Sequence, residues 1–140
     1  MLSGVKLYMR NEKFVAEWLR RAKSNLERAK AGRICEDILY EDLCFDCQQA
    51  VEKALKALLI SINREFPPTH SIARLLELIE DTGINIPDEV KNAVELTDYA
   101  VKARYPGEME PVTEEEYKRA IKIAETVFEW VKGLLACLPE

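Results

Sequence analysis

The chain has 140 residues, of which 48% are hydrophobic and 32% charged, so we expect one domain over residues 1–140, with its core within about 10–135. Twenty Lys and Arg against 25 Asp and Glu give a formal net charge of −5, which excludes the global positive field that draws proteins to DNA or to anionic membranes. The sequence has neither the apolar run of a signal peptide nor the roughly 20 apolar residues that span a bilayer, and we therefore expect a soluble, cytoplasmic protein.

The first predicted helix runs from an N-cap at Asn11 to about Ala31, where Gly32 supplies a stop. Its apolar residues recur at spacings of four and three, which is typical of an amphipathic helix. They are Val15, Leu19, Ala22, Leu26 and Ala29. The segment from Ile34 to Glu41 is a short connector with room for one turn of helix.

The central predicted helix runs from Asp42 to Arg64 and ends before Pro67 and Pro68. Its apolar residues cover more than a third of the helix circumference, so several neighbours must pack around it. They are Leu43, Cys44, Cys47, Ala50, Val51, Ala54, Leu55, Leu58, Leu59 and Ile62. The remaining strip is a polar row along the helix. The row consists of Asp46, Gln49, Lys53 and Lys56, and a single amide, Gln48, points among the apolar positions.

Two further helices are predicted between residues 69 and 105. The first is capped by Thr69 or Ser71, ends near Asp81 and is closed by Thr82–Gly83. Its inward positions are Ile72, Leu75, Leu76 and Ile79. The next helix starts at Pro87–Asp88, and its apolar side repeats at four, three and four. That side contains Val90, Val94, Thr97 and Val101, and the next position in the register is Arg104.

The last predicted helix opens with a capping box, Thr113 and Glu116. Its apolar stripe alternates spacings of four and three, a pattern that serves either packing within the bundle or a dimer. The stripe contains Tyr117, Ile121, Ala124, Phe128, Val131, Leu135 and Leu138. We find no alternation long enough for a strand, so the sequence predicts an all-α fold.

The cysteines do not predict a metal site. Cys44 and Cys47 have C-x2-C spacing, but they lie in a helical run, without a second such pair and with one histidine in the chain. A thioredoxin-like motif would need a preceding strand. We interpret the pair as small buried apolar thiols and expect neither a metal nor another cofactor.

Two places could carry chemistry. Arg104, at a helix end, either satisfies the last carbonyls and the helix dipole or binds a phosphate with its five donors. Tyr105 beside it offers an aromatic face for a base or simply packs. His70, the one histidine, lies near a helix N-terminus, where backbone donors favour an anion and a neutral imidazole; a capping role is the alternative.

These residues together resemble the HEPN domain (higher eukaryotes and prokaryotes nucleotide-binding). The resemblance covers roughly residues 10 to 135. It is carried by the run Gln48–Leu59, by Thr69-His70-Ser71-Ile72 with Leu75-Leu76, by Tyr99 and by Arg104-Tyr105-Pro106. It implies an all-α up-and-down bundle of four main helices plus a short helix, usually a homodimer with its site at the bundle interface.

The resemblance also implies a range of functions. Many such proteins are encoded beside a minimal nucleotidyltransferase, and the pair resembles a toxin–antitoxin module in which the HEPN member is a ribonuclease or a nucleotide binder. Ribonuclease members carry an arginine followed, after four to six intervening residues, by a histidine. Here Met109, Glu110 and Pro111 stand at those places after Arg104, and this departure argues against a ribonuclease.

Our first hypothesis is therefore a non-catalytic or weakly catalytic protein that binds a nucleotide or other substrate and partners a minimal nucleotidyltransferase. Arg104 would bind phosphate, Tyr105 would orient the helix end or stack, and His70 would add a polar contact. Lys53 and Lys56 either bind phosphate or form a solvated face, with Glu52 paired to Lys56. The alternatives are a metal-independent endoribonuclease that uses Arg104 and His70, and a structural dimeric adaptor.

Overall fold

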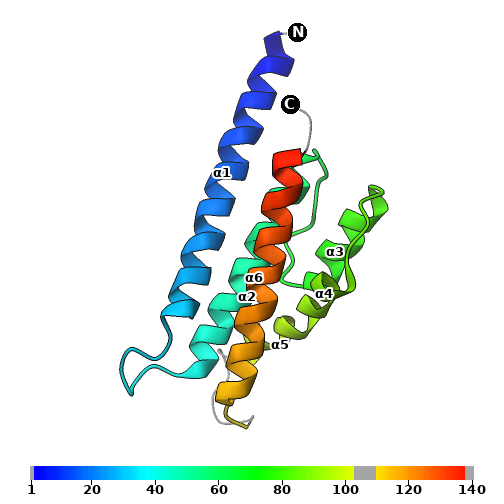
Figure 1. The fold of residues 1–140 in the computed structure, drawn as a ribbon. Coiled ribbons are helices and arrows are strands. Elements are labelled where there is room, and N and C mark those ends of the chain that lie inside the picture. The colour runs from blue at the N-terminus through cyan, green and yellow to red at the C-terminus, as the bar shows by residue number, and fades with distance from the viewer. Residues whose placement is uncertain (1, 103–109, 138–140) are drawn as a thin grey trace.

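A computed structural model describes residues 2–102 and 110–137, with side chains in 11–100 and 110–137. Every regular element in these ranges is helical, which confirms the predicted all-α class (Figure 1). The elements are α1 (Leu2–Ala31), α2 (Tyr40–Ser61), α3 (Ile72–Asp81), α4 (Asp88–Lys91), the 3₁₀ helix η1 (Asn92–Thr97), α5 (Asp98–Lys102) and α6 (Glu114–Cys137).

The long helices form the frame of the bundle. In Figure 1, α1 runs antiparallel to both α2 and α6, while α3 and the α4–α5 segment lie on the far side of α2 and α6 from α1. Helix α2 contacts all of the other layers, and its buried positions run from Leu43 to Leu59. The expectation that this helix forms the centre of the bundle is therefore confirmed. The fourth main helix of the predicted bundle corresponds to the broken segment α4, η1 and α5.

Three predicted helix ends differ from the observed ones, and the smallest difference is that α2 begins at Tyr40 rather than at Asp42. Helix α1 begins at Leu2, so Asn11 lies inside the helix and is not its cap. The Asn11 amide instead donates to the side chain of Asn63, in the turn after α2. Helix α2 ends at Ser61 rather than at Arg64, because Asn63 adopts a left-handed backbone with φ of 55°. Asparagine tolerates this conformation better than most residues, so it ends the helix locally.

The start of α3 follows the predicted cap chemistry. The Ser71 hydroxyl accepts a hydrogen bond from the Arg74 backbone N–H at 3.2 Å. One step earlier, the Thr69 hydroxyl accepts from the Ser71 backbone N–H at 3.0 Å. These two bonds satisfy donors at the helix N-terminus, and they also fix the direction in which His70 leaves the turn.

The predicted single helix after Pro87 is instead interrupted by η1, and its predicted apolar side holds at Val90 but is wrong at Val94. The positions that are buried are Val90, Ala93, Leu96 and Tyr99. Their spacing of three matches the three residues per turn of a 3₁₀ helix, and Val94 is 43% exposed. The register that placed Arg104 on an apolar side therefore does not hold over this segment; Arg104 and Tyr105 themselves lie outside the described residues.

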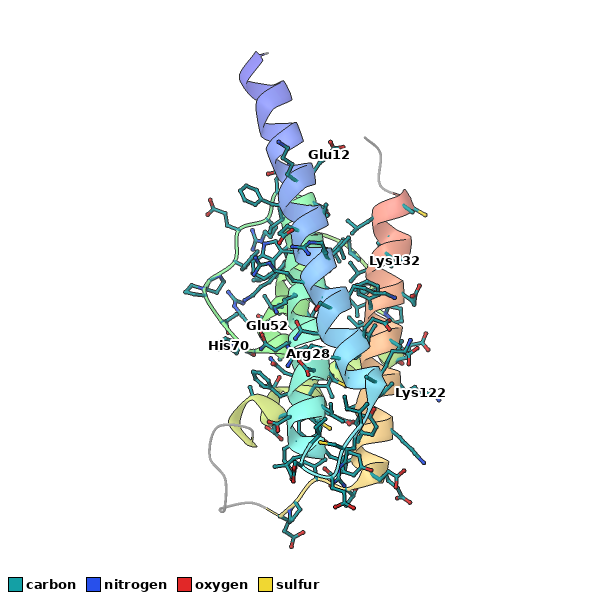
Figure 2. All side chains as sticks on the ribbon, turned by 90° about the vertical axis from the view of Figure 1, so that its left-hand side faces the viewer. Glu12, Arg28, Glu52, His70, Lys122 and Lys132 are labelled. Atoms are coloured by element: carbon teal, nitrogen blue, oxygen red, sulfur yellow. The ribbon has the colours of Figure 1, made fainter. Side chains whose placement is uncertain are left out.

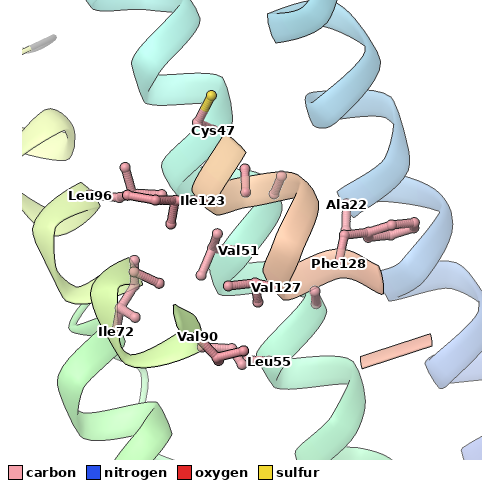
Figure 3. Close-up of a cluster of buried hydrophobic side chains, with 14 of the residues drawn as sticks. Ala22, Cys47, Val51, Leu55, Ile72, Val90, Leu96, Ile123, Val127 and Phe128 are labelled. Atoms are coloured by element: carbon pink, nitrogen blue, oxygen red, sulfur yellow. The ribbon is translucent and has the colours of Figure 1, made fainter. Parts of the chain in front are cut away.

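Helix α6 begins as predicted but uses only half of its capping box. The Thr113 hydroxyl accepts from the Glu116 backbone N–H at 3.1 Å, while the Glu116 carboxylate accepts from the Tyr99 hydroxyl at 3.2 Å. The helix buries a face wider than the predicted stripe, against α1 and α2 (Figure 3). Its buried residues are Ala120, Ile123, Ala124, Val127, Phe128 and Val131.

Cys44 and Cys47 are thiols buried in the core, as predicted for the C-x2-C pair. Burial raises the pKa of the Cys47 thiol, with the neighbouring Cys44 adding to the effect. The Cys47 thiol is therefore kept neutral.

The threefold spacing can be tested with a matched pair of truncations. Leu96→Ala should destabilise the protein by about 2 to 5 kcal/mol, because it opens a cavity at a position that is 1% exposed. Val94→Ala should change the free energy of unfolding by less than about 1 kcal/mol. Urea unfolding followed by circular dichroism measures both. A larger loss for Val94→Ala would restore the fourfold register and overturn the observed one.

Candidate functional site

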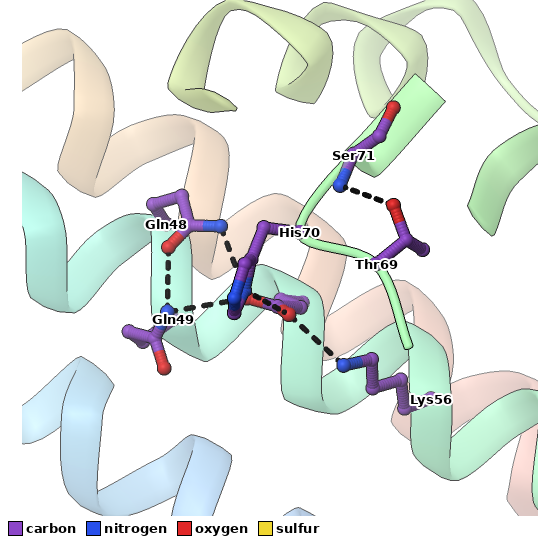
Figure 4. A network of polar contacts seen from close by, with 7 residues as sticks. Gln48, Gln49, Lys56, Thr69, His70 and Ser71 are labelled. Atoms are coloured by element: carbon purple, nitrogen blue, oxygen red, sulfur yellow. Dashed lines mark hydrogen bonds and ion pairs between the residues drawn. The ribbon is translucent and has the colours of Figure 1, made fainter. Parts of the chain in front are cut away.

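A buried carboxylate organises a polar network at the middle of α2. Glu52 is 3% exposed. Its Oε1 lies 2.9 Å from Lys56 Nζ and 2.9 Å from His70 Nδ1. Its Oε2 accepts from the side-chain amides of Gln48 and Gln49, at 3.1 Å each. Four donors thus surround one carboxylate, as Figure 4 shows, which is the condition for burying a charge at acceptable cost.

The sequence spacing of α2 produces most of this network. Gln48, Glu52 and Lys56 stand four residues apart and Gln49 three before Glu52, so their side chains meet on one helix face. His70 reaches the same point from another segment. The chain leaves α2 at Ser61, nine residues or roughly 13 Å of helix beyond Glu52, and the segment before α3 runs back far enough for His70 to contact Glu52.

The imidazole of His70 is fixed on one side and open on the other. Gln48, Gln49 and Lys56 can only donate to the Glu52 carboxylate, so the carboxylate acts as the acceptor for His70 and Nδ1 carries the proton. The side chain is otherwise 61% exposed. Nε2 is thus the ring nitrogen that remains for a ligand, with its tautomer set by the bond to Glu52.

Lys56 is held inside the fold. Its side chain is only 12% exposed, and its ammonium lies 5.7 Å from the ring centroids of both Trp18 and Phe66. Two aromatic faces and the Glu52 carboxylate therefore share this cation. The predicted i, i+4 pair between Glu52 and Lys56 is confirmed, and the polar row of α2 is not a solvated face, since it packs towards α1.

Lys53, three residues earlier, has a different environment. Its Nζ donates to Asn25 Oδ1 of α1 at 2.7 Å, and within the described residues it has no carboxylate at ion-pair distance. Desolvation lowers the pKa of Lys53, and the positive charge of Arg21 lowers it further. The cation is therefore partly buried with an amide oxygen as its acceptor and without a full counter-charge.

The nearby carboxylate of Asp46 is engaged elsewhere. Asp46 is 5% exposed; its Oδ1 accepts from Asn25 Nδ2 at 2.9 Å, and its Oδ2 lies 3.5 Å from Arg28 Nε. Asn25 thus joins Asp46 to Lys53 across the α1–α2 interface. The side chain of Arg28 is largely exposed, and its contact with Asp46 places it beside this Asn25 bridge (Figure 2).

A groove lies beside these residues, with a volume of about 660 Å³, which falls within the usual range of small-molecule sites. Its walls come from the end of α1, the connector and the first half of α2. The lining residues are Asn25, Arg28, Ala31, Gly32, Ile34, Asp37, Ile38, Asp42, Leu43, Phe45, Asp46, Gln49 and Lys53. Gln49 lines the groove and also donates to Glu52, so the groove and the Glu52 network adjoin.

The structure brings three of the predicted site residues together. Lys53, Lys56 and His70 all lie along the polar face of α2, whereas Arg104 and Tyr105 are outside the described residues. Sequence reasoning missed Glu52 as the centre of the network, and it missed the contribution of α1 through Asn25 and Arg28. The one available signal was Gln48, an amide at an apolar position of the helix, because a buried amide requires a buried polar partner.

Two other kinds of site find no support within residues 2–102 and 110–137. No group of three or more His, Cys, Asp or Glu side chains there could hold a metal ion. No helix in the described ranges has an apolar stretch that could cross a bilayer.

The fold and the polar face of α2 define an all-α bundle protein with a polar cluster on its central helix. The model of the HEPN domain family matches residues 15–134, and the chain belongs to this family. It is 30% identical over 143 residues to the protein named "Putative toxin MJ1304" of Methanocaldococcus jannaschii, a match that covers 89% of this chain and 90% of that protein.

Solved structures that are similar to this chain include HEPN proteins. An archaeal HEPN homologue, ST0689, is 32% identical with a TM-score of 0.69, covering 86% of this chain and 96% of its own. TT1696 from Thermus thermophilus is 30% identical with a TM-score of 0.71, covering 85% and 96%. A HEPN domain protein from Thermotoga maritima is 25% identical with a TM-score of 0.58, covering 92% and 99%.

The Glu52 network can be tested through stability. Glu52→Ala should cost about 3 kcal/mol or more, because it leaves the Lys56 ammonium and the Gln48 amide buried without their acceptor. Glu114→Ala, at an exposed position on α6, is the matched control and should have little effect. Urea unfolding measures both. An equal loss in the free energy of unfolding for the two variants would show that the buried contacts of the Glu52 carboxylate do not stabilise the fold.

Proposed function

We propose that this chain is the HEPN component of a two-component, toxin–antitoxin-like module, and that it binds a nucleotide or another phosphate-bearing substrate. Membership of the HEPN family and the likeness to a protein named as a toxin support the toxin-like part. The homodimer and the minimal nucleotidyltransferase as partner are further parts of this proposal, and they rest on the family likeness stated from the sequence.

The observation that carries the binding role is the environment of Lys53. The ammonium is partly buried, desolvation lowers its pKa, and its hydrogen-bond acceptor is the neutral amide of Asn25, while the carboxylates of Glu52 and Asp46 act on it only from a distance. A phosphate would supply the missing counter-charge through short, charge-assisted hydrogen bonds. Proposed ligands of the phosphate are Lys53, His70, and Arg104 with Tyr105 stacking beside it. Lys56, which was expected to bind phosphate as well, would instead hold the Glu52 carboxylate that positions His70.

Titration calorimetry with adenosine 5′-monophosphate and adenosine 5′-triphosphate tests this function. Lys53→Gln and Arg104→Ala should each weaken binding by about tenfold, the usual effect of losing a charged hydrogen bond of 1.5 to 3 kcal/mol. Affinity should also fall as pH rises towards 10.5, the ordinary lysine value, because Lys53 loses its charge below that pH.

The control is Lys122→Gln, an exposed lysine on α6 away from the site (Figure 2), which should bind as the wild type does. Absence of nucleotide binding by the wild type at millimolar concentration would refute the nucleotide-binding role.

One observation favours a second candidate, a metal-independent endoribonuclease. Glu52 holds His70 with Nδ1 protonated and Nε2 outward, which is the arrangement of a general base. Nε2 would accept the proton of a ribose 2′-hydroxyl as that oxygen attacks the adjacent phosphorus. The bond between phosphorus and the 5′-oxygen would then break, the 5′-oxygen would take a proton from water, and a 2′,3′-cyclic phosphate would remain.

This candidate predicts RNA cleavage that survives a chelator. His70→Ala should reduce the rate by a factor of about 10² to 10⁴, the usual contribution of a general base, and Arg104→Ala should reduce it as well. Incubation of purified protein with RNA and excess chelator, followed by gel analysis, measures this. RNA left intact by the wild type would exclude the ribonuclease and leave nucleotide binding as the proposal.

A further inference from the structure

The Lys53 side chain has a neutral hydrogen-bond acceptor. Its Nζ donates to Asn25 Oδ1 at 2.7 Å, and the Asn25 amide nitrogen donates in turn to the Asp46 carboxylate at 2.9 Å. Because Asp46 accepts, the amide presents its oxygen to Lys53. An amide oxygen accepts from a neutral amine as well as from an ammonium, whereas a carboxylate in direct contact favours the ammonium. The contact with Asn25 therefore leaves both forms of Lys53 available, and the neutral amine is the nucleophilic one.

Charged groups on both helices act on the same nitrogen. Desolvation has the largest effect and lowers the pKa of Lys53, and Arg21 and Arg28 on α1 lower it as well. Glu52 and Asp46 on α2 raise it, but the net shift is downward, since within the described residues neither carboxylate lies at ion-pair distance from Lys53. A desolvated amine next to other cations is the environment in which lysine acts as a nucleophile.

The groove of about 660 Å³ gives a small electrophile access to this nitrogen, because Lys53 and Arg28 both line it. The Asn25–Asp46 pair joins them, since Lys53 contacts Asn25 and Arg28 Nε lies 3.5 Å from Asp46. The side chain of Arg28 is 71% exposed, and its Nη donors have no partner in the part of the chain that the structure describes. A guanidinium binds phosphate well. A nucleophilic amine and a phosphate-binding group thus adjoin the same polar pair.

From this arrangement we propose that Lys53 is a site of covalent acylation by small acyl phosphates. The phosphate of the donor contacts Arg28, which brings the acyl carbon to Lys53 Nζ. The neutral amine attacks that carbon, the bond between the carbon and the bridging oxygen breaks, and the phosphate leaves with the electron pair. The nitrogen then loses one proton to water, and the product is a neutral amide.

Acylation would regulate the proposed phosphate binding. It removes the positive charge of Lys53, and the proposed function uses that charge to hold a phosphate. The acylated protein should therefore bind nucleotide about tenfold less tightly, the usual effect of losing a charged hydrogen bond. This consequence rests on the proposed function, whereas the acylation itself does not.

Two other lysines of the same molecule provide the comparison. Lys56 is paired with Glu52 at 2.9 Å and is only 12% exposed, so an acyl donor reaches it poorly. Lys122 is exposed on α6 (Figure 2), and none of the described side chains pairs with its ammonium. The proposal predicts that Lys53 reacts first, Lys122 second and Lys56 last. Exposure alone would place Lys122 first.

Acetyl phosphate is the probe for this order. The folded protein is treated with it near neutral pH, then denatured and treated with excess deuterated acetic anhydride. The ratio of light to heavy acetyl groups at each lysine, measured by mass spectrometry, gives the extent of the first reaction. Lys53 should react about tenfold faster than Lys122, because the bound phosphate adds proximity to nucleophilicity. A rate for Lys53 at or below that of Lys122 would overturn the proposal.

Arg28→Gln tests the phosphate contact. It should slow the reaction of Lys53 with acetyl phosphate by about threefold or more and leave Lys122 unchanged. The loss should be smaller with acetylimidazole, an acyl donor without phosphate. Arg20→Gln, at a 74% exposed position of α1, is the matched control and should react as the wild type does. An equal loss with both donors for Arg28→Gln would refute the contact between Arg28 and the phosphate.

Calorimetry with adenosine 5′-monophosphate separates this proposal from the proposed function. Treatment with acetyl phosphate should weaken nucleotide binding by the wild type. Lys53→Arg keeps the charge and cannot form acetyl-lysine, so it should retain after treatment whatever affinity it has before. If Lys53 reacts first but the untreated wild type binds no nucleotide, the acylation stands and the proposed function fails. If the wild type binds nucleotide but Lys53 reacts no faster than Lys122, the acylation fails and nucleotide binding stands.

Discussion

The burial of one negative charge, that of Glu52, is the constraint on which the rest of this face depends. A carboxylate at 3% exposure in the centre of a helical bundle must be surrounded by donors. Three of them come from α2 itself at helical spacing, and the fourth, His70, can come only from a segment that runs back along the helix. The contact between His70 and Glu52 therefore constrains the path of the chain between α2 and α3.

The same constraint divides the two lysines of α2 into different roles. Lys56 lies beside the buried carboxylate and between two aromatic rings, so its charge is balanced inside the fold. Lys53 is one turn away, yet it meets an amide of α1, and its pKa is lowered by desolvation and by Arg21. The charges of Glu52 and Asp46 offset this only in part. A partly buried cation without a carboxylate in direct contact lowers the stability of the fold, and ligands often bind at such places.

The arrangement also explains how one small bundle carries both a core and a ligand face. Helix α2 is buried on the sides that meet α3, η1 and α6, and its polar row faces α1, where Asn25 and Arg28 complete the cluster. The connector held by Arg33 extends that face into a groove. The family relatives share the bundle over most of their length.

The sequence by itself determined the all-α class, the central place of α2, and the cap chemistry of α3 and α6, because these depend on local periodicity and on side chains next to helix ends. It also identified Lys53 and Lys56 as polar groups in one row along α2, and His70 as a polar group near the start of the next helix. It failed for the segment after Pro87, where a 3₁₀ turn changed which residues are buried and tertiary packing overrode the apparent fourfold register.

Only the tertiary structure decided what those polar groups do. The contact between Glu52 and His70 joins segments 18 residues apart, and the bond between Lys53 and Asn25 joins different helices. Neither pairing leaves a trace in helical spacing, because spacing describes one helix at a time. The balance of charge around each lysine is set by neighbours from other elements, and that balance separates a structural cation from one that can receive a ligand.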